Sequence, residues 1–89
     1  MMTRYERELS QKIADRYGRL SAKEFLSKLF EIGVVDYTRC KALIVREYVD
    51  ETIKKGNKKI DAMWIAAEHF GCSYEYVRKC IYYYKDIHL

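Results

Sequence analysis

Residues 66–81 read AAEHFGCSYEYVRKCI, and this stretch decides the fold of the chain. Gly71 stands between two segments of helical periodicity, at a position where a left-handed backbone costs little without a Cβ. Ser73 follows as a helix N-cap, whose side-chain oxygen accepts a hydrogen bond from a free backbone N–H. Ala67 is small enough to let two helices approach closely, and Val77 is placed to pack the second helix on the first. The stretch predicts two short helices joined by a tight corner.

The remaining helices are predicted from their start and stop signals. Gly18, Gly33 and Gly56 follow apolar residues of helical spacing and indicate helix ends. Ser21 and Glu24 have the spacing of a capping box, in which each satisfies a loose backbone donor of the other. The expected helices span about Arg4–Tyr17, a segment opened at Ser21 and closed at Gly33, Tyr37–Lys55 capped by Asp36, Lys59–Phe70 and Tyr74–Ile87.

Composition favours an all-α fold. The chain has 89 residues, 49% of them hydrophobic, no proline and only 4 glycines, so few breakers interrupt the helical periods. This length is that of one domain. We therefore expect a single helical domain over residues 1–89, a compact five-helix bundle with a long central helix and a helix-turn-helix at about 59–87.

The long third helix is expected to be apolar on two sides. Such a helix is usually sandwiched between neighbours, so it is predicted to join the N-terminal pair of helices to the C-terminal motif. A contact with a second subunit is the alternative for part of one stripe. The first stripe contains Tyr37, Cys40, Ile44 and Tyr48, and the second contains Ala42, Val45, Val49 and Ile53.

A helical wheel divides the last expected helix into two sides, at ~100° per residue. The side expected to pack inward holds Tyr76, Val77, Cys80, Ile81, Tyr83, Tyr84 and Ile87. The side expected to face outward holds Glu75, Arg78, Lys79, Tyr82, Lys85 and Asp86. In a helix-turn-helix the outward side of the second helix enters the major groove of DNA.

The C-terminal third resembles the helix-turn-helix superfamily of bacterial and phage DNA-binding proteins. Ala67, Gly71 and Val77 match the alanine, the turn glycine and the later valine or isoleucine of that pattern. The long helix, the Gly56-Asn57 turn and the terminal motif also look faintly like phage middle-operon transcription activators. The resemblance implies a protein that binds double-stranded DNA with a recognition helix beginning near Ser73.

Roles for the candidate DNA-binding residues follow from their side chains. The fork of Arg78 matches the O6 and N7 acceptors of guanine, and Glu75 is able to accept from a cytosine amino group. Lys79, Lys85 and the Tyr82 hydroxyl suit phosphates. Lysines near Gly56-Asn57 are either phosphate contacts or a solvated helix end, and a formal charge of +4 agrees with a polyanionic partner. The expected DNA-binding residues are Lys58, Lys59, Ser73, Tyr74, Glu75, Arg78, Lys79, Tyr82 and Lys85.

Two readings of this function stay open. The first is a sequence-specific DNA-binding protein, either a transcriptional regulator or an accessory factor of a phage or mobile element. A homodimer that spans two half-sites is physically reasonable for it, because one recognition helix gives little affinity. The alternative is a protein–protein interaction module built on the same fold, since a fold does not fix a function.

Other classes of function find no support in the sequence. No catalytic constellation or phosphate-cradling loop is present, so we expect no enzyme activity, no cofactor and no small-molecule substrate. Cys40, Cys72 and Cys80 fit no common zinc spacing and are expected to be buried, reduced thiols. Trp64 is expected to anchor a core or an interface. The absence of an apolar span or signal peptide predicts a cytoplasmic protein that does not enter a membrane.

Overall fold

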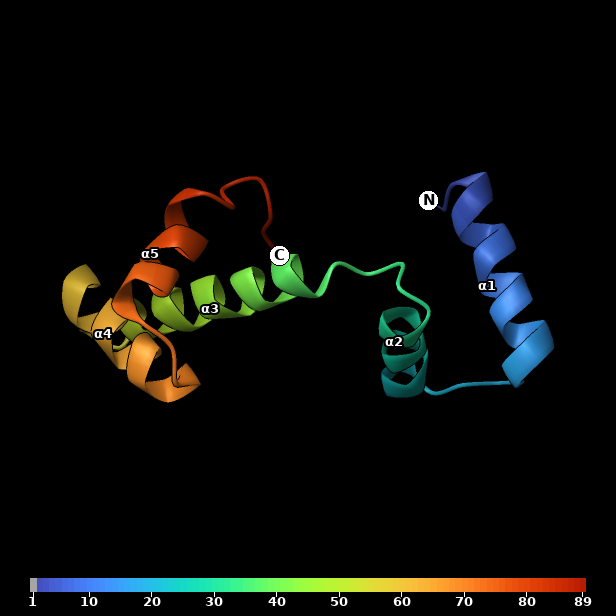
Figure 1. Ribbon diagram of the computed structural model, residues 1–89, viewed down its shortest axis with the longest axis horizontal. Coiled ribbons are helices and arrows are strands. Elements are labelled where there is room, and N and C mark those ends of the chain that lie inside the picture. The colour runs from blue at the N-terminus through green and yellow to red at the C-terminus, as the bar shows by residue number, and fades with distance from the viewer. Residues whose placement is uncertain (1) are drawn as a thin grey trace. The chain divides into compact units, whose positions relative to one another are not determined.

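The computed structural model describes residues 2–89, and over these residues the chain is entirely helical (Figure 1). The all-α expectation is confirmed, and the bounds expected for the first and fourth helices agree with those observed. The chain divides into two compact units, Met1–Val35 and Asp36–Leu89, and each is described by itself. The five helices are α1 (Arg4–Tyr17), α2 (Ala22–Glu31), α3 (Tyr37–Lys54), α4 (Lys59–Phe70) and α5 (Tyr74–Tyr82).

Side-chain caps fix where both helices of the unit Met1–Val35 begin. The Thr3 hydroxyl accepts from the backbone N–H of Glu6 at the start of α1. At the start of α2 the Ser21 hydroxyl accepts from the Glu24 N–H, and the Glu24 carboxylate accepts from the Ser21 N–H, each at 3.2 Å. The expected capping box is confirmed. Each such cap stabilises a helix by ~1 kcal/mol.

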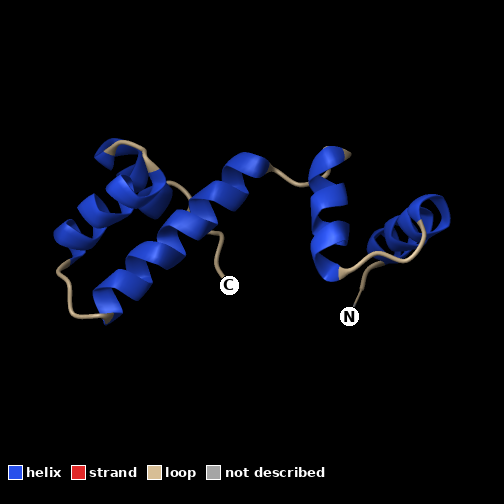
Figure 2. Cartoon of the chain, turned by 90° about the horizontal axis from the view of Figure 1, so that it is seen from below, coloured by secondary structure: helices blue, strands red, loops and turns tan. Residues whose placement is uncertain are grey.

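The core of the unit Asp36–Leu89 forms where α4 and α5 lie against α3 (Figure 2). Small side chains dominate this core, so the three helices approach one another closely. Val49 and Val77 are the largest aliphatic side chains that are fully buried in it, and burying each is worth ~1.5–3 kcal/mol. The buried set is Ala42, Val45, Val49, Ala62, Met63, Ala66, Ala67, Val77 and Cys80.

The corner between α4 and α5 has the geometry expected at Gly71. Its backbone is left-handed, with φ +64° and ψ +36°, and the next N–H, that of Cys72, donates to the carbonyl of Ala67 at 3.0 Å. The Ser73 hydroxyl then accepts from the N–H of Tyr76 at 3.1 Å and opens α5. One helix therefore stops and the next starts within three residues, Gly71 to Ser73.

Gly71→Ala should lower the free energy of unfolding by about 1 kcal/mol, because an L residue is disfavoured in the left-handed region. Nothing lies within 4 Å of an added Cβ, so the cost is one of backbone conformation and not of a clash. Gly71→Asn should cost less, since asparagine tolerates this region. Urea unfolding measures both variants. An alanine variant as stable as the wild type would contradict the assigned corner.

The fifth helix is shorter than expected: it ends at Tyr82, whereas the sequence predicted an end at Ile87. The segment that follows is held against α3 by two arginines of that helix. Arg46 donates to the carbonyls of Tyr84 and of Ile87, the latter at 2.7 Å. Arg39 pairs with Asp86 at 2.5 Å. These contacts with residues far away in the sequence hold the segment in a non-helical path. The periodicity of apolar residues along the sequence does not reveal such contacts.

The Arg39–Asp86 pair also responds to pH. Its hydrogen bond from Arg39 lowers the pKa of the Asp86 carboxyl below its ordinary value. A lowered carboxyl pKa means that the pair contributes to stability above the unfolded pKa of ~3.9 and loses that contribution as pH falls through the folded value. Both side chains are substantially exposed, so the contribution is small.

Arg46→Met should release the C-terminal segment while keeping much of the aliphatic stem. Hydrogen bonds from a charged donor are worth about 1.5–3 kcal/mol, and the Arg46 side chain is half-buried, so a loss of about 1–3 kcal/mol is expected. Amide hydrogen exchange should accelerate at Ile87 while the α4 amides stay protected. The control is Lys55→Met, which removes an exposed cation from the end of α3. Equal effects of the two variants would contradict this role.

The aromatic residues correct two further expectations. Trp64 is 57% exposed and stacks on Tyr74 at 4.5 Å, so it is no core anchor. Of the two stripes on α3, the one with Val45 and Val49 is buried, whereas Tyr37 and Ile44 of the other are 64% and 50% exposed. Alanines fill most of the inward positions of α4. Helix α5 packs against the side of α3 that carries Val49. Large side chains of the remaining positions therefore stay at the surface.

Candidate nucleic-acid interface

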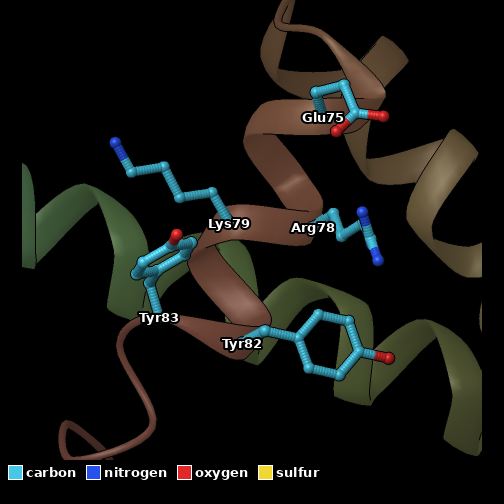
Figure 3. A pocket seen from close by; sticks show the side chains of 5 residues that line it. All are labelled: Glu75, Arg78, Lys79, Tyr82 and Tyr83. Atoms are coloured by element: carbon cyan, nitrogen blue, oxygen red, sulfur yellow. The ribbon is translucent and has the colours of Figure 1, made fainter.

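The outward side of α5 carries the charged side chains expected there. Glu75, Arg78 and Lys79 are exposed and, with Tyr82 and Tyr83, line a shallow hollow of about 490 Å³. Figure 3 shows Lys79 and Tyr83 on one flank of α5 and Arg78 and Tyr82 on the other, with Glu75 nearer the start of the helix. Helix α5 packs on α3 and α4 through Val77 and Cys80, which are fully buried. The buried pair fixes which side of the helix is open.

Tyr82 joins the start of α4 to the end of α5. The Lys59 ammonium lies 4.8 Å from the centroid of the Tyr82 ring, and the Arg78 guanidinium lies 5.9 Å from it. The pKa of the Tyr82 hydroxyl is lowered, first by hydrogen bonding to Lys59 and then by the positive charges of Lys59, Arg78 and Lys85. We call Lys59, Arg78, Lys79, Tyr82 and Lys85 the basic face.

The first turn of α4 adds backbone donors beside the basic face. Lys58 occupies the N-cap position and makes no capping hydrogen bond, so no side chain covers the first-turn N–H groups there. Asp61 lies in the same turn and offsets part of the positive end of the helix. Lys58 and Lys59 are both exposed. The start of α4 is thus exposed, with an uncapped first turn, on the side where Lys59 meets Tyr82.

Lys59→Met should raise the pKa of Tyr82, because it removes the hydrogen bond and the nearest of the charges that lower it. The pH titration of tyrosine ring carbons by NMR measures the shift, with Tyr82→Phe assigning the resonance. Lys58→Met is the matched control, since Lys58 is not among the groups that lower this pKa. A Tyr82 pKa that stays unchanged in Lys59→Met would mean that the two elements do not meet as described.

Two of the expected contacts lie at the corner and are occupied by structural interactions. Ser73 is exposed, but its hydroxyl caps α5 through the Tyr76 N–H. The Tyr74 ring is half-buried on Trp64, and its hydroxyl donates to the Met63 sulfur at 3.8 Å. These two residues therefore position the first turn of α5. Glu75 is the first fully outward side chain of the helix.

One tyrosine and one lysine near the end of α5 differ from the helical-wheel expectation. Lys85 lies in a turn after the helix, yet its charge still acts on Tyr82. Tyr84 packs against the core as expected, but Tyr83 is 78% exposed beside Lys79. On the helical wheel Tyr83 lies only about 40° from Lys79, at ~100° per residue. This position at the edge of the apolar side is the sequence feature that could have predicted its exposure.

The cysteines and histidines form no metal site in the described part of the chain. No group of three or more His, Cys, Asp or Glu side chains converges there. All three cysteines are free thiols, but only Cys80 is buried, whereas Cys40 and Cys72 are half-buried. Burial raises the pKa of the Cys80 thiol, which makes it a neutral core group.

Comparisons with known proteins give no relative for this chain. No protein-family model, no curated protein and no solved structure matches it. Within residues 2–89, no helix combines the length and the apolar character that crossing a membrane requires. The basic face and the Gly71 corner that presents it are therefore the features of the chain that bear on its function.

Proposed function

We propose that this protein binds double-stranded DNA through α4 and α5, with α5 entering the major groove. The observation that carries the proposal is the placement of Lys59 and Arg78 around Tyr82, with Lys79 also exposed on α5, outside the core and after a glycine corner. Helix-turn-helix proteins use such a corner to present the second helix to base edges. The corner, the Ser73 cap and the buried Val77 all support this arrangement.

The dimensions of α5 suit the major groove. An α-helix with its side chains is ~10–12 Å across and the groove of B-DNA is ~12 Å wide, so the helix fits into it. The nine residues of α5 span about 13 Å along its axis. Within this pose Arg78 donates two hydrogen bonds to guanine, and Glu75, one turn earlier, accepts from a cytosine amino group. Arg78 and Glu75 would therefore contribute most of the sequence preference.

The lysines and Tyr82 supply the contacts that position the protein. Lys59, Lys79 and Lys85 offer ammonium groups to phosphates, and the Tyr82 hydroxyl adds a neutral donor. Lys58 and the uncapped first turn of α4 offer further contacts to phosphates of the adjacent stretch of the DNA backbone. Each neutralised phosphate releases counterions, so the affinity should fall steeply as salt rises.

Binding to duplex DNA indicates a general class of cellular role for this protein. A protein that reads duplex DNA with one short helix suits a transcriptional regulator or an accessory factor of a phage or mobile element. A nine-residue helix touches few base pairs, and a homodimer on two half-sites about one helical turn apart would double the contact. Neither cofactor nor small-molecule substrate is needed for this activity.

The test is selection from a random duplex pool followed by gel shift at increasing salt. The wild type should enrich a defined site. Arg78→Ala with Lys79→Ala should weaken binding at least about tenfold, since one bidentate base contact alone is worth ~1–3 kcal/mol. Arg7→Ala with Lys12→Ala removes the same two charges from exposed positions on α1 and is the control. It should leave site selection unchanged.

The alternative function is a protein-interaction module, and Glu75 on the same surface favours it. A carboxylate next to Arg78 and Lys79 weakens attraction to phosphates and suits a partner of mixed charge. Absence of any salt-sensitive binding to duplex DNA at low ionic strength would overturn the DNA proposal in favour of this one. Loss of binding in the α1 control equal to that in the α5 variant would also count against α5 as the reading helix.

A further inference from the structure

An apolar groove is lined by the first half of α3, the Gly71 corner and Tyr76 of α5. Its volume is about 440 Å³, within the range of ~300–1,000 Å³ typical of sites for small organic molecules. Ile44 and Tyr37 of its wall are half or more exposed, and Val45 closes its floor. The lining residues are Tyr37, Cys40, Lys41, Ile44, Val45, Phe70, Gly71, Cys72 and Tyr76.

Lys41 is the one charged side chain among these lining residues. Its ammonium lies 5.7 Å from the ring centroid of Tyr37 and 5.7 Å from that of Tyr76, so it stands between two aromatic walls. No carboxylate lies within 4 Å of it anywhere in residues 2–89. The groove thus combines apolar walls with a single cation that lacks a counter-charge.

The other polar groups of the groove add no negative charge. Burial raises the pKa of the Tyr76 hydroxyl, as do the neighbouring thiols of Cys80 and Cys72, so this tyrosine stays neutral at pH 7. Cys40 and Cys72 are half-buried free thiols and behave as soft apolar surface. The electrostatics of the groove are therefore set by Lys41.

We infer that this groove binds a small organic monoanion with an apolar body, such as an aromatic carboxylate or sulfonate. The anionic head pairs with the Lys41 ammonium, and the body lies on Ile44 and Phe70. The single cation favours one negative charge over two, and the aromatic and aliphatic walls favour a ligand with an apolar body. No residue of the basic face lines the groove, so this inference is independent of DNA binding.

The test uses 8-anilinonaphthalene-1-sulfonate as the probe and the full chain as the receptor. The probe should bind saturably to one site. Lys41→Gln should weaken it at least about tenfold, Lys41→Arg should bind within about threefold of the wild type, and Ile44→Glu should abolish binding. Lys54→Gln removes an exposed cation from the same helix outside the groove and is the control. The uncharged N-phenyl-1-naphthylamine should bind equally to wild type and Lys41→Gln.

The cysteines provide a second readout that does not depend on probe emission. Bound probe should slow the alkylation of Cys40 and Cys72 by iodoacetamide, as followed by peptide mass spectrometry. Cys80 is fully buried and its modification reports unfolding, so a folded variant keeps it protected. Circular dichroism of each variant confirms that loss of binding is not loss of the fold.

Three results would overturn the inference. Probe affinity that is equal in wild type, Lys41→Gln and Ile44→Glu would place the probe elsewhere. Saturating probe that leaves Cys40 and Cys72 equally reactive would do the same. A dimer in sedimentation that Ile44→Glu converts to a monomer would make the groove a surface for a second copy of the chain, and not a site for a small anion.

Discussion

The left-handed backbone at Gly71 is the constraint on which the unit Asp36–Leu89 depends. It ends α4, turns the chain, and allows Ser73 to start α5 two residues later. Val77 and Cys80 then enter the core, which leaves Arg78 and Lys79 outside. A different corner would rotate α5 about its axis and bury charge in place of the valine. The glycine corner and the two buried side chains together thus orient the basic face.

Alanine packing is the second determinant of this unit. Ala42, Ala62 and Ala66 have no exposed surface, so three helices meet over very small side chains. Such a core leaves little interior volume for rings, and aromatic residues collect at the surface instead. Tyr48, for example, stacks on His69 at 4.3 Å outside the core.

Local signals predicted the parts of the fold that local interactions determine. The bounds of α1 and α4, the Ser21–Glu24 box and the Gly71 corner depend on residues within a few positions of each other. The end of α5 does not, because Arg46 and Arg39 act on the C-terminal segment from 38 and 47 residues away. For the candidate site, Arg78 and Lys79 were placed correctly on the open side. Tyr83 was predicted to face inward but is exposed, since it lies at the edge of the apolar side of α5, where the neighbouring helices do not cover it.

The pairing of Trp64 with Tyr74 carries a practical consequence. Trp64 is the chain's one tryptophan, and its indole stacks across the corner on the first residue of α5. A shift of the second motif helix against the first would separate these rings and change the polarity around the indole. Intrinsic tryptophan emission therefore reports directly on the helix that carries Arg78, without any added label.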